Sequence, residues 1–304
     1  MTDVLIIGAG PSGLTAALYA LRAGLKVTVI EKKVYGGQVA ITNKIENYPG
    51  FNEISGIELS NSIFNQVTKL GCEFIFEEVV KVDLKGNVKR VITKTKEICS
   101  KSVIIANGLK RRKLGCSGEN EFEGKGVSYC ATCDGSLFKG KKVCVVGGGN
   151  TALEDALYLS NICESVILIV RREEFRAETY LIESIKSKDN ITCEMGKRVD
   201  SIQGDKIVKS VNIVDKNNNI KKIDVSGVFI SIGYEPDNSI YKNELNLDEN
   251  NYFISNEDCL TNIEGVFVAG DCRKKFLRQI VTAVADGAVA AAQASKFLIT
   301  NFNS

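Results

Sequence analysis

The residues best suited to chemistry are two cysteines three positions apart, Cys130 and Cys133, with Asp134 directly after them. A Cys-x-x-Cys pair can close a small disulfide, and one thiol of such a pair often has a lowered pKa. The pair can therefore pass two electrons to the disulfide of another protein. Because the chain contains no histidine, Asp134 is the nearest residue able to carry a proton during this chemistry.

Two other interpretations of the cysteine pair are weaker. A zinc site needs about four ligands, and the chain offers neither a second Cys-x-x-Cys nor a histidine, so no metal site is predicted. An inert structural disulfide belongs to an oxidising compartment, whereas the other eight of the ten cysteines are scattered singly and are expected to be reduced core residues. For Asp134, a role as a helix cap or turn residue stays open.

A glycine-rich loop near the N-terminus predicts a first nucleotide site. Apolar residues 4–7 predict a strand, followed by the sequence GAGPSG and a helical pattern over residues 14–23. Glycines let the backbone approach a pyrophosphate, and the start of the helix attracts its charge. A second strand over residues 26–30 ends at an acid placed to bind a ribose hydroxyl of FAD or NAD. The candidate residues are Gly8, Gly10, Pro11, Ser12, Gly13, Glu31 and Lys32.

The same pattern recurs downstream and predicts a second nucleotide site. A strand over residues 142–146 precedes a second glycine loop, a helix over residues 153–159 and a strand over residues 166–170. Arginines replace the acid at the ribose position, and guanidinium groups pair with phosphate, so a 2'-phosphate and hence NADPH is predicted. A solvated basic helix start is the alternative. The candidates are Gly147, Gly149, Asn150, Thr151, Ala152, Arg171, Arg172 and Arg176.

The order of the strands predicts one domain inserted into another. Buried strands over residues 103–106 and 266–269 both end in polar turns, although the second lies far from the first glycine loop. Turn-rich crossings near residues 110–116 and 234–241 mark the boundaries. We therefore expect a discontinuous FAD-binding domain of residues 1–112 plus 240–304 and an NADPH-binding domain of residues 113–239 that carries the cysteine pair.

Composition excludes several function classes. The chain has 304 residues, is 44% hydrophobic and carries a net charge of +2, which leaves no broad basic field for nucleic acid. Neither a signal-like start nor an apolar span of membrane length is visible in the sequence. We expect a cytoplasmic protein that binds neither nucleic acid nor membrane.

Taken in order, these motifs resemble the bacterial-type, low-molecular-weight thioredoxin reductases over nearly the whole chain. The resemblance rests on GAGPSGL from Gly8, GGQ from Gly36, ENYPG from Glu46, CATCDG from Cys130, the second glycine loop with its arginines, and Gly270-Asp271 with Arg278-Gln279-Ile280. It implies an α/β fold of two Rossmann-like domains, FAD in the outer one and NADPH in the inserted one, and a homodimer that reduces thioredoxin.

The same resemblance implies residue roles. Cys133 faces the flavin, Cys130 attacks the disulfide of thioredoxin, and Asp134 exchanges protons, while the inserted domain rotates about the two crossings. The residues it implies around the flavin are Gly37, Gln38, Asn47, Asp271, Arg278, Gln279 and Ile280.

The chain departs from the family pattern in three places. Val170 stands where histidine is common, which leaves room for NADH, and Asn107 stands where threonine is common. The run from Cys272 to Lys275 after Asp271 has no assigned role. Two rival functions remain: a thiol oxidase or reductase of the same fold with another electron donor such as ferredoxin, and a non-catalytic flavin redox sensor.

Overall fold

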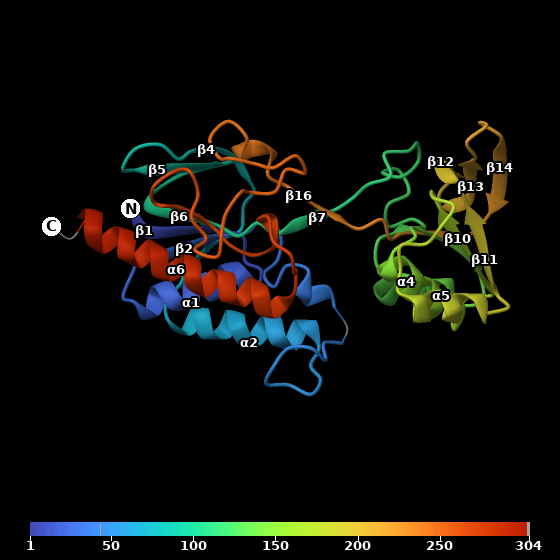
Figure 1. Cartoon of the computed structure of the whole chain (residues 1–304), viewed down its shortest axis with the longest axis horizontal. Helices are drawn as coiled ribbons and strands as arrows, with labels where there is room; N and C mark the ends of the chain where they lie inside the picture. The colour runs from blue at the N-terminus through green and yellow to red at the C-terminus, as the bar shows by residue number, and fades with distance from the viewer. Residues whose placement is uncertain (43, 303–304) are drawn as a thin grey trace. The chain divides into compact units, whose positions relative to one another are not determined.

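The chain folds into two compact units, one inserted into the other (Figure 1). The structure, a computed structural model, describes residues 1–42 and 44–302. Unit 1 consists of Met1–Lys110 and Pro236–Ser304, and unit 2 of Arg111–Glu235. The expected boundaries were 112/113 and 239/240, so the observed division lies two and four residues earlier.

Unit 1 is built on a seven-stranded sheet with the order β3-β2-β1-β6-β5-β4, in which β17 also pairs with β6. Strands β1, β2, β3, β6 and β17 run parallel to one another, whereas β5 pairs antiparallel with β6, and β4 pairs antiparallel with β5. The strands are β1 (Thr2–Ile7), β2 (Val27–Ile30), β3 (Glu73–Ile75), β4 (Val79–Asp83), β5 (Lys89–Thr93), β6 (Glu97–Ile105) and β17 (Val266–Val268).

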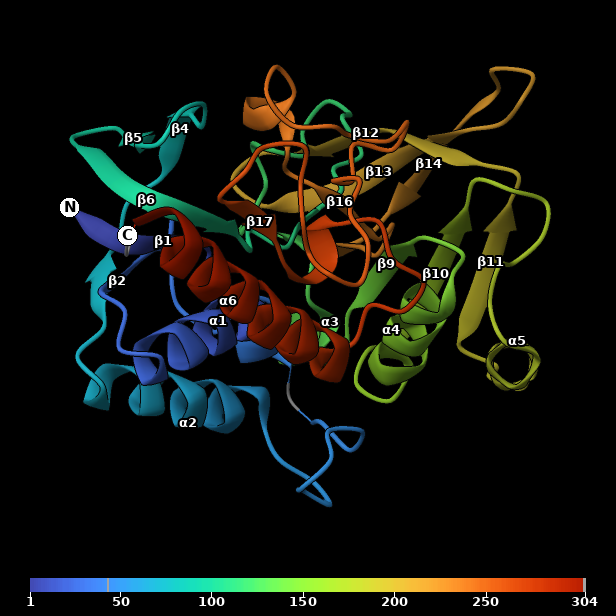
Figure 2. The ribbon, with the colours of Figure 1, turned by 60° about the vertical axis from the view of Figure 1, so that its left-hand side comes forward.

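Both faces of the central part of this sheet are buried, which explains why β2, β17 and the ends of β1 and β6 are nearly continuous apolar runs rather than alternating ones. On one face, Val4 and Ile6 of β1 pack in a cluster with the helices; on the other, Leu5 and Ile7 pack with Tyr241 and its neighbours. Figure 2 shows the helices together on one side of the sheet. They are α1 (Pro11–Arg22), α2 (Gly56–Lys69) and α6 (Ile280–Phe302).

Unit 2 repeats this plan. Its five-stranded sheet has the order β11-β10-β9-β15-β8, entirely parallel, and a separate three-stranded antiparallel sheet has the order β12-β13-β14. The strands are β8 (Val127–Ser128), β9 (Lys142–Val146), β10 (Ser165–Val170), β11 (Ile191–Met195), β12 (Arg198–Gly204), β13 (Val208–Val214), β14 (Ile220–Asp224) and β15 (Gly227–Ile230); the helices are α3 (Ala131–Asp134), α4 (Asn150–Ser160) and α5 (Thr179–Lys186).

The two units therefore share one Rossmann-like core, in which the strand before the glycine loop, β1 or β9, lies inside the parallel sheet and a helix follows it directly. The α/β class predicted from the sequence is confirmed. The two segments that connect the units, β7 (Leu109–Arg111) and β16 (Tyr234–Pro236), pair with each other in a two-stranded sheet. None of the helices in the described range is long and apolar enough to cross a membrane.

Candidate functional site

The cysteine pair closes a disulfide at the start of α3, directly after β8 ends. Cys130 and Cys133 are joined, with their Cα atoms 5.3 Å apart. Cys130 is also the N-cap of α3, because its sulfur accepts the backbone N–H of Cys133 at 3.2 Å. The remaining eight cysteines carry free thiols. The redox pair predicted from the sequence is thus a formed disulfide on a short helix of unit 2.

Asp134 is held by a serine that sequence reasoning missed. The hydroxyl of Ser128 lies 2.6 Å from Oδ2 of Asp134, and the backbone N–H of Cys130 donates to the same hydroxyl at 3.0 Å. Nothing in the local sequence distinguishes Ser128 from any serine at a strand end. Its role becomes visible only because α3 folds back toward the end of β8.

The first glycine loop connects β1 to α1, and two of its glycines are required by the protein itself. Gly8 has a φ of +106°, and a Cβ there would lie 2.3 Å from the carbonyl oxygen of Ala106. A Cβ on Gly13 would lie 1.8 Å from the carbonyl oxygen of Gly8. Gly10, in contrast, faces open space, with nothing within 4 Å of its Cβ position. That open side is where a pyrophosphate can approach the start of α1.

Two other predicted loops lie against this glycine loop. The N–H of Gly36 donates to Ala9 at 2.7 Å, and the Cβ position of Gly37 is 3.3 Å from Gly10. The Cβ position of Gly270 is 2.5 Å from the Ser12 hydroxyl. The sequence-predicted segments around residues 8–13, 36–38 and 270–271 therefore meet at one place in unit 1.

Two more of the residues implied around the flavin contact each other. The side-chain amide of Asn47 donates to Oε1 of Gln279 at 3.0 Å, although the two are 232 residues apart. Gln38 donates to the backbone carbonyl of Leu109 at 3.4 Å. Arg278 stacks over Tyr252, with its guanidinium carbon 4.2 Å from the ring centre, and Ile280 begins α6.

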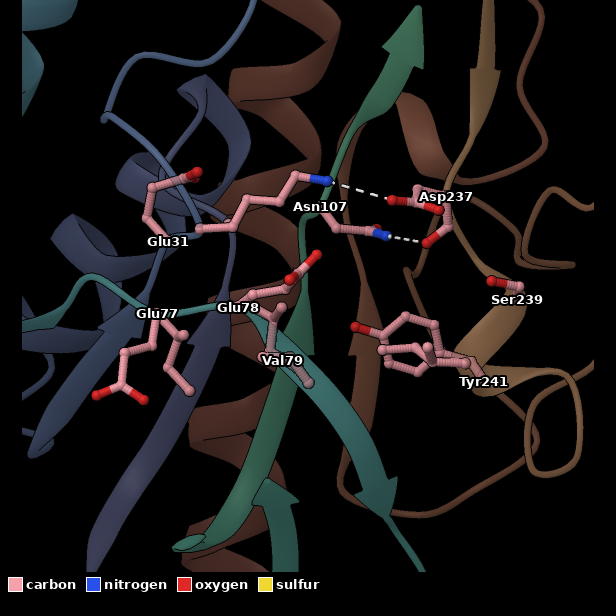
Figure 3. Close-up of a pocket in the computed structure, with 13 residues that line it drawn as sticks. Glu31, Glu77, Glu78, Val79, Asn107, Asp237, Ser239 and Tyr241 are labelled. Atoms are coloured by element: carbon pink, nitrogen blue, oxygen red, sulfur yellow. Dashed lines mark hydrogen bonds and ion pairs between the residues drawn. The ribbon is translucent and has the colours of Figure 1, made fainter. Parts of the chain in front are cut away.

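A pocket of about 300 Å³ opens beside the ends of β1 and β2 (Figure 3). Glu31 lines it and accepts the N–H of Ala9 at 2.9 Å and that of Lys33 at 2.9 Å, so the carboxylate is fixed against the glycine loop. Lys32 pairs with Asp237 at 3.2 Å. Asn107, after a predicted strand, and Asp237, in a predicted crossing, also line it. Sequence reasoning missed other lining residues, including Glu77, Glu78, Val79, Ser239 and Tyr241.

The surroundings of Asp271 indicate whether the residues of unit 1 can hold a flavin nucleotide. Its Oδ1 is buried and has no hydrogen-bond partner among the described residues. Burial raises the pKa of this carboxyl group, outweighing the nearby charges of Lys275 and Arg278. A buried carboxylate oxygen without a donor fits a ligand that brings hydroxyl groups, as the ribityl chain of FAD does. Together with the open side of Gly10, this oxygen makes the residues present a fit for FAD.

The second glycine loop joins β9 to α4 in unit 2. Gly147 has a φ of +148°, and a Cβ there would lie 2.3 Å from the carbonyl oxygen of Ser231 and 2.7 Å from the side chain of Ala152. Gly149 is the N-cap of α4, which Asn150 and Thr151 begin. Asn150 exchanges hydrogen bonds with Glu178 at 3.0 and 2.9 Å. The start of α4 thus presents backbone N–H groups, the arrangement that binds a pyrophosphate.

The predicted arginines lie next to this loop. The N–H of Arg176 donates to the carbonyl of Gly148 at 2.7 Å, and Arg172 and Arg176 line an open pocket that Glu173 and Glu174 also share. The side chains of Arg171, Arg172 and Arg176 are exposed and form no ion pair with any residue that the structure describes. Unpaired guanidinium groups beside a nucleotide loop fit a 2'-phosphate. Val170 is buried and packs beneath the loop.

Comparison with known proteins shows the family of this chain. Residues 2–287 match the family model of pyridine nucleotide-disulphide oxidoreductases. The chain belongs to this family. It is 42% identical over 308 residues to a thioredoxin reductase from Peptoclostridium acidaminophilum, covering 99% of this chain and 98% of the relative, and 41% identical over 293 residues to one from Mycoplasma genitalium, covering 95% and 92%.

Solved structures give the same result. The thioredoxin reductase of Lactococcus lactis in its FR conformation superimposes with a TM-score of 0.89 at 39% identity, covering 99% of this chain and all of that one. The thioredoxin reductase of T. acidophilum superimposes with a TM-score of 0.85 at 36% identity, covering 98% and 99%. The resemblance drawn from the motifs is thereby confirmed along the full chain.

Proposed function

We propose that this protein is a thioredoxin-disulfide reductase that passes electrons from NADPH through FAD to the Cys130–Cys133 pair and on to thioredoxin. The observation that carries the proposal is the disulfide at the start of α3 in a chain that has two separate nucleotide loops. Each loop supplies one redox nucleotide site, and the disulfide supplies the exit for the electrons. Full-length similarity to thioredoxin reductases supports thioredoxin as the acceptor.

Unit 1 holds FAD in this proposal. Gly10, Pro11 and Ser12 at the start of α1 bind the pyrophosphate, Glu31 binds the ribose of the adenosine, and Asp271 accepts from the ribityl hydroxyls. Asn47 and Gln279, which already contact each other, orient the ring edge. FAD held by these residues would supply the two-electron chemistry that links the pyridine nucleotide to the disulfide.

The reduced pair then carries out two thiol–disulfide exchanges. The Cys130 thiolate attacks one sulfur of the thioredoxin disulfide, that bond breaks, and the other thioredoxin sulfur leaves with the electron pair and takes up a proton. Cys133 attacks the sulfur of Cys130, and the second thioredoxin sulfur leaves and is protonated. Thioredoxin gains two electrons and two protons, the pair returns to the disulfide seen here, and Asp134 carries protons from the cysteine thiols.

Assays of the purified flavoprotein test this function directly. NADPH should bleach the bound flavin, and NADPH with a bacterial thioredoxin should release thiols that react with DTNB. If reduced ferredoxin bleaches the flavin and NADPH does not, the electron donor is ferredoxin rather than NADPH. Bleaching without transfer to any thioredoxin would favour a redox sensor and reject the reductase.

Nucleotide preference gives a sharper prediction. Replacing Arg172 and Arg176 together with alanine removes two charged donors from the 2'-phosphate, so we expect the KM for NADPH to rise about ten- to hundredfold and the KM for NADH to change little. Initial rates of flavin reduction with both nucleotides measure this. Arg198→Ala, an exposed arginine elsewhere in unit 2, is the control. Equal losses with both nucleotides would show that these arginines do not select the phosphate.

We further propose a cytoplasmic homodimer. The eight free thiols among the ten cysteines support a reducing compartment, and the dimer rests on the resemblance to the family. Sedimentation of the flavin-loaded protein at several concentrations measures the assembly. A single monomeric species at micromolar concentration would reject the dimer.

A further inference from the structure

Ser128 occupies a position from which one hydroxyl reaches both parts of the redox site. Its side chain is only 6% exposed. It accepts the N–H of Cys130 at 3.0 Å and lies 2.6 Å from Oδ2 of Asp134 and 3.3 Å from the backbone oxygen of Cys130. The serine therefore bridges the attacking cysteine and the acid that follows the pair.

The backbone that carries this hydroxyl belongs to the parallel sheet of unit 2. Ser128 is the last residue of β8, and β8 pairs in parallel with β15, where Ser128 stands opposite Phe229. Phe229 is fully buried and packs edge-on against Phe138, which follows α3. The pairing with β15 thus positions the backbone of Ser128, and the hydroxyl hydrogen can turn about the Cβ–Oγ bond.

The Ser128 hydroxyl can form a hydrogen bond with Asp134 whether or not the carboxyl group carries a proton. A hydroxyl has one hydrogen to donate and two lone pairs to accept with. When Asp134 is ionised, the hydrogen points to the carboxylate, which is the nearer acceptor by 0.7 Å. When Asp134 carries a proton, its O–H donates to Ser128, and the serine hydrogen turns to the carbonyl of Cys130. Asp134 keeps a partner throughout a proton exchange.

We propose that Ser128 is a positioning residue for the dithiol chemistry, holding Asp134 in one orientation beside Cys130 and Cys133 while the proton comes and goes. The proposal rests on the reductase function proposed above. Without the hydroxyl, the carboxylate can rotate away and the N–H of Cys130 loses its acceptor. A misplaced acid slows proton transfer without affecting how the nucleotides bind.

The test compares variants that differ only in the hydroxyl. Threonine and valine have nearly the same shape, so Ser128→Thr and Ser128→Val differ from each other only in the hydroxyl. Ser128→Ala removes the hydroxyl without adding any atom larger than hydrogen. Asp134→Asn and its combination with Ser128→Ala complete a double-mutant cycle. Ser160→Ala is the matched control, because Ser160 is a buried serine of unit 2 whose hydroxyl donates only to its own helix at Leu157.

Two different disulfide acceptors, DTNB and thioredoxin, allow the role of Ser128 to be tested separately from the proposed function. The flavoprotein, with its disulfide closed, is first treated with N-ethylmaleimide to block its accessible free thiols. It is then reduced with dithiothreitol, desalted, and mixed in a stopped-flow instrument either with DTNB or with oxidised thioredoxin. Flavin bleaching by NADPH is recorded for every variant. A wild type that reacts with DTNB but not with thioredoxin rejects the reductase function, and the DTNB arm still decides the role of Ser128.

We expect Ser128→Ala and Ser128→Val to slow the exchange about tenfold at saturating acceptor, with Ser128→Thr and Ser160→Ala within about twofold of wild type. Bleaching by NADPH stays unchanged. In the Asp134→Asn background, removing the hydroxyl costs less than about twofold, because both changes remove the same interaction. Equal rates for the threonine and valine variants would overturn the proposal, and so would a tenfold loss that persists without Asp134.

Discussion

Replacing either cysteine of the pair should abolish thioredoxin reduction, but the two variants should stop at different points. Cys130→Ser cannot attack the disulfide of thioredoxin, so no covalent complex forms. Cys133→Ser can attack but cannot resolve the mixed disulfide, so Cys130 stays bonded to thioredoxin. We expect turnover with NADPH to fall more than about a thousandfold in both, because no other thiol can replace the missing sulfur.

Mass spectrometry of the protein after incubation with oxidised thioredoxin distinguishes the two variants. An adduct with Cys133→Ser and none with Cys130→Ser supports the roles assigned here. The reverse pattern would exchange the two roles. Flavin bleaching by NADPH should remain intact in both variants. Cys193→Ser is the control, since Cys193 is an exposed free thiol of unit 2 and should leave turnover unchanged.

Asp286 should carry the largest effect on stability. Its carboxylate, on α6, is buried with Arg273 and Lys275, which donate at 2.7 to 2.8 Å, and it also accepts the N–H of Gly270 at 2.9 Å. Asp286→Ala removes the carboxylate that two buried cations share, leaves them mainly the backbone carbonyls of Asn256 and Thr282, and takes the acceptor from the N–H of Gly270. The free energy of unfolding should therefore fall by about 3–5 kcal/mol, which denaturation in urea measures.

The pH dependence of stability gives this prediction a second readout. Burial alone would raise the pKa of Asp286, but the hydrogen bonds and charges of Arg273 and Lys275 outweigh burial and hold it below its ordinary value. The stabilisation is therefore fully present above the unfolded pKa of about 4 and is lost as the pH falls through the lower folded value. Wild type should lose stability below about pH 4 more steeply than Asp286→Ala.

A surface carboxylate supplies the comparison. Asp205 also pairs with a lysine, Lys209, but its side chain is 74% exposed. Asp205→Ala should change the free energy of unfolding by less than about 1 kcal/mol, because exposed ion pairs contribute little. A similar cost for the two alanine variants would show that the buried cluster adds no special stability. Flavin content should fall with Asp286→Ala, since Gly270 and Arg273 flank Asp271.

The sequence predicts local features of this protein well. Both glycine loops follow from their own spacing, because Gly8 and Gly13 must lack a Cβ to let β1, α1 and the chain at Ala106 meet. The helices begin earlier than expected, at Pro11 and Asn150, because the last residues of each loop already form the first turn. The spacing of residues close together in the sequence is enough to predict these loops and the helices that follow them.

Long-range partners escape such reasoning. Lys32 and Asp237 are 205 residues apart, and Asn107 donates to Asn238 across 131 residues at 3.1 Å. The insertion of unit 2 separates these partners in sequence, while the sheet of unit 1 brings them together. The buried cluster around Asp286 could not be predicted from the sequence for a related reason. No local pattern distinguishes a buried carboxylate from an exposed one in a helix rich in small residues.

The pairing of β7 with β16 has a consequence for how the chain is made. Because the insertion enters and leaves at adjacent strands, unit 2 completes both of its sheets from residues 111–235 alone. The ribosome synthesises all of these residues before it makes β17 and α6, which unit 1 needs to finish its sheet and cover α1. The inner unit is therefore ready to fold first, and the outer one closes only when synthesis is nearly over.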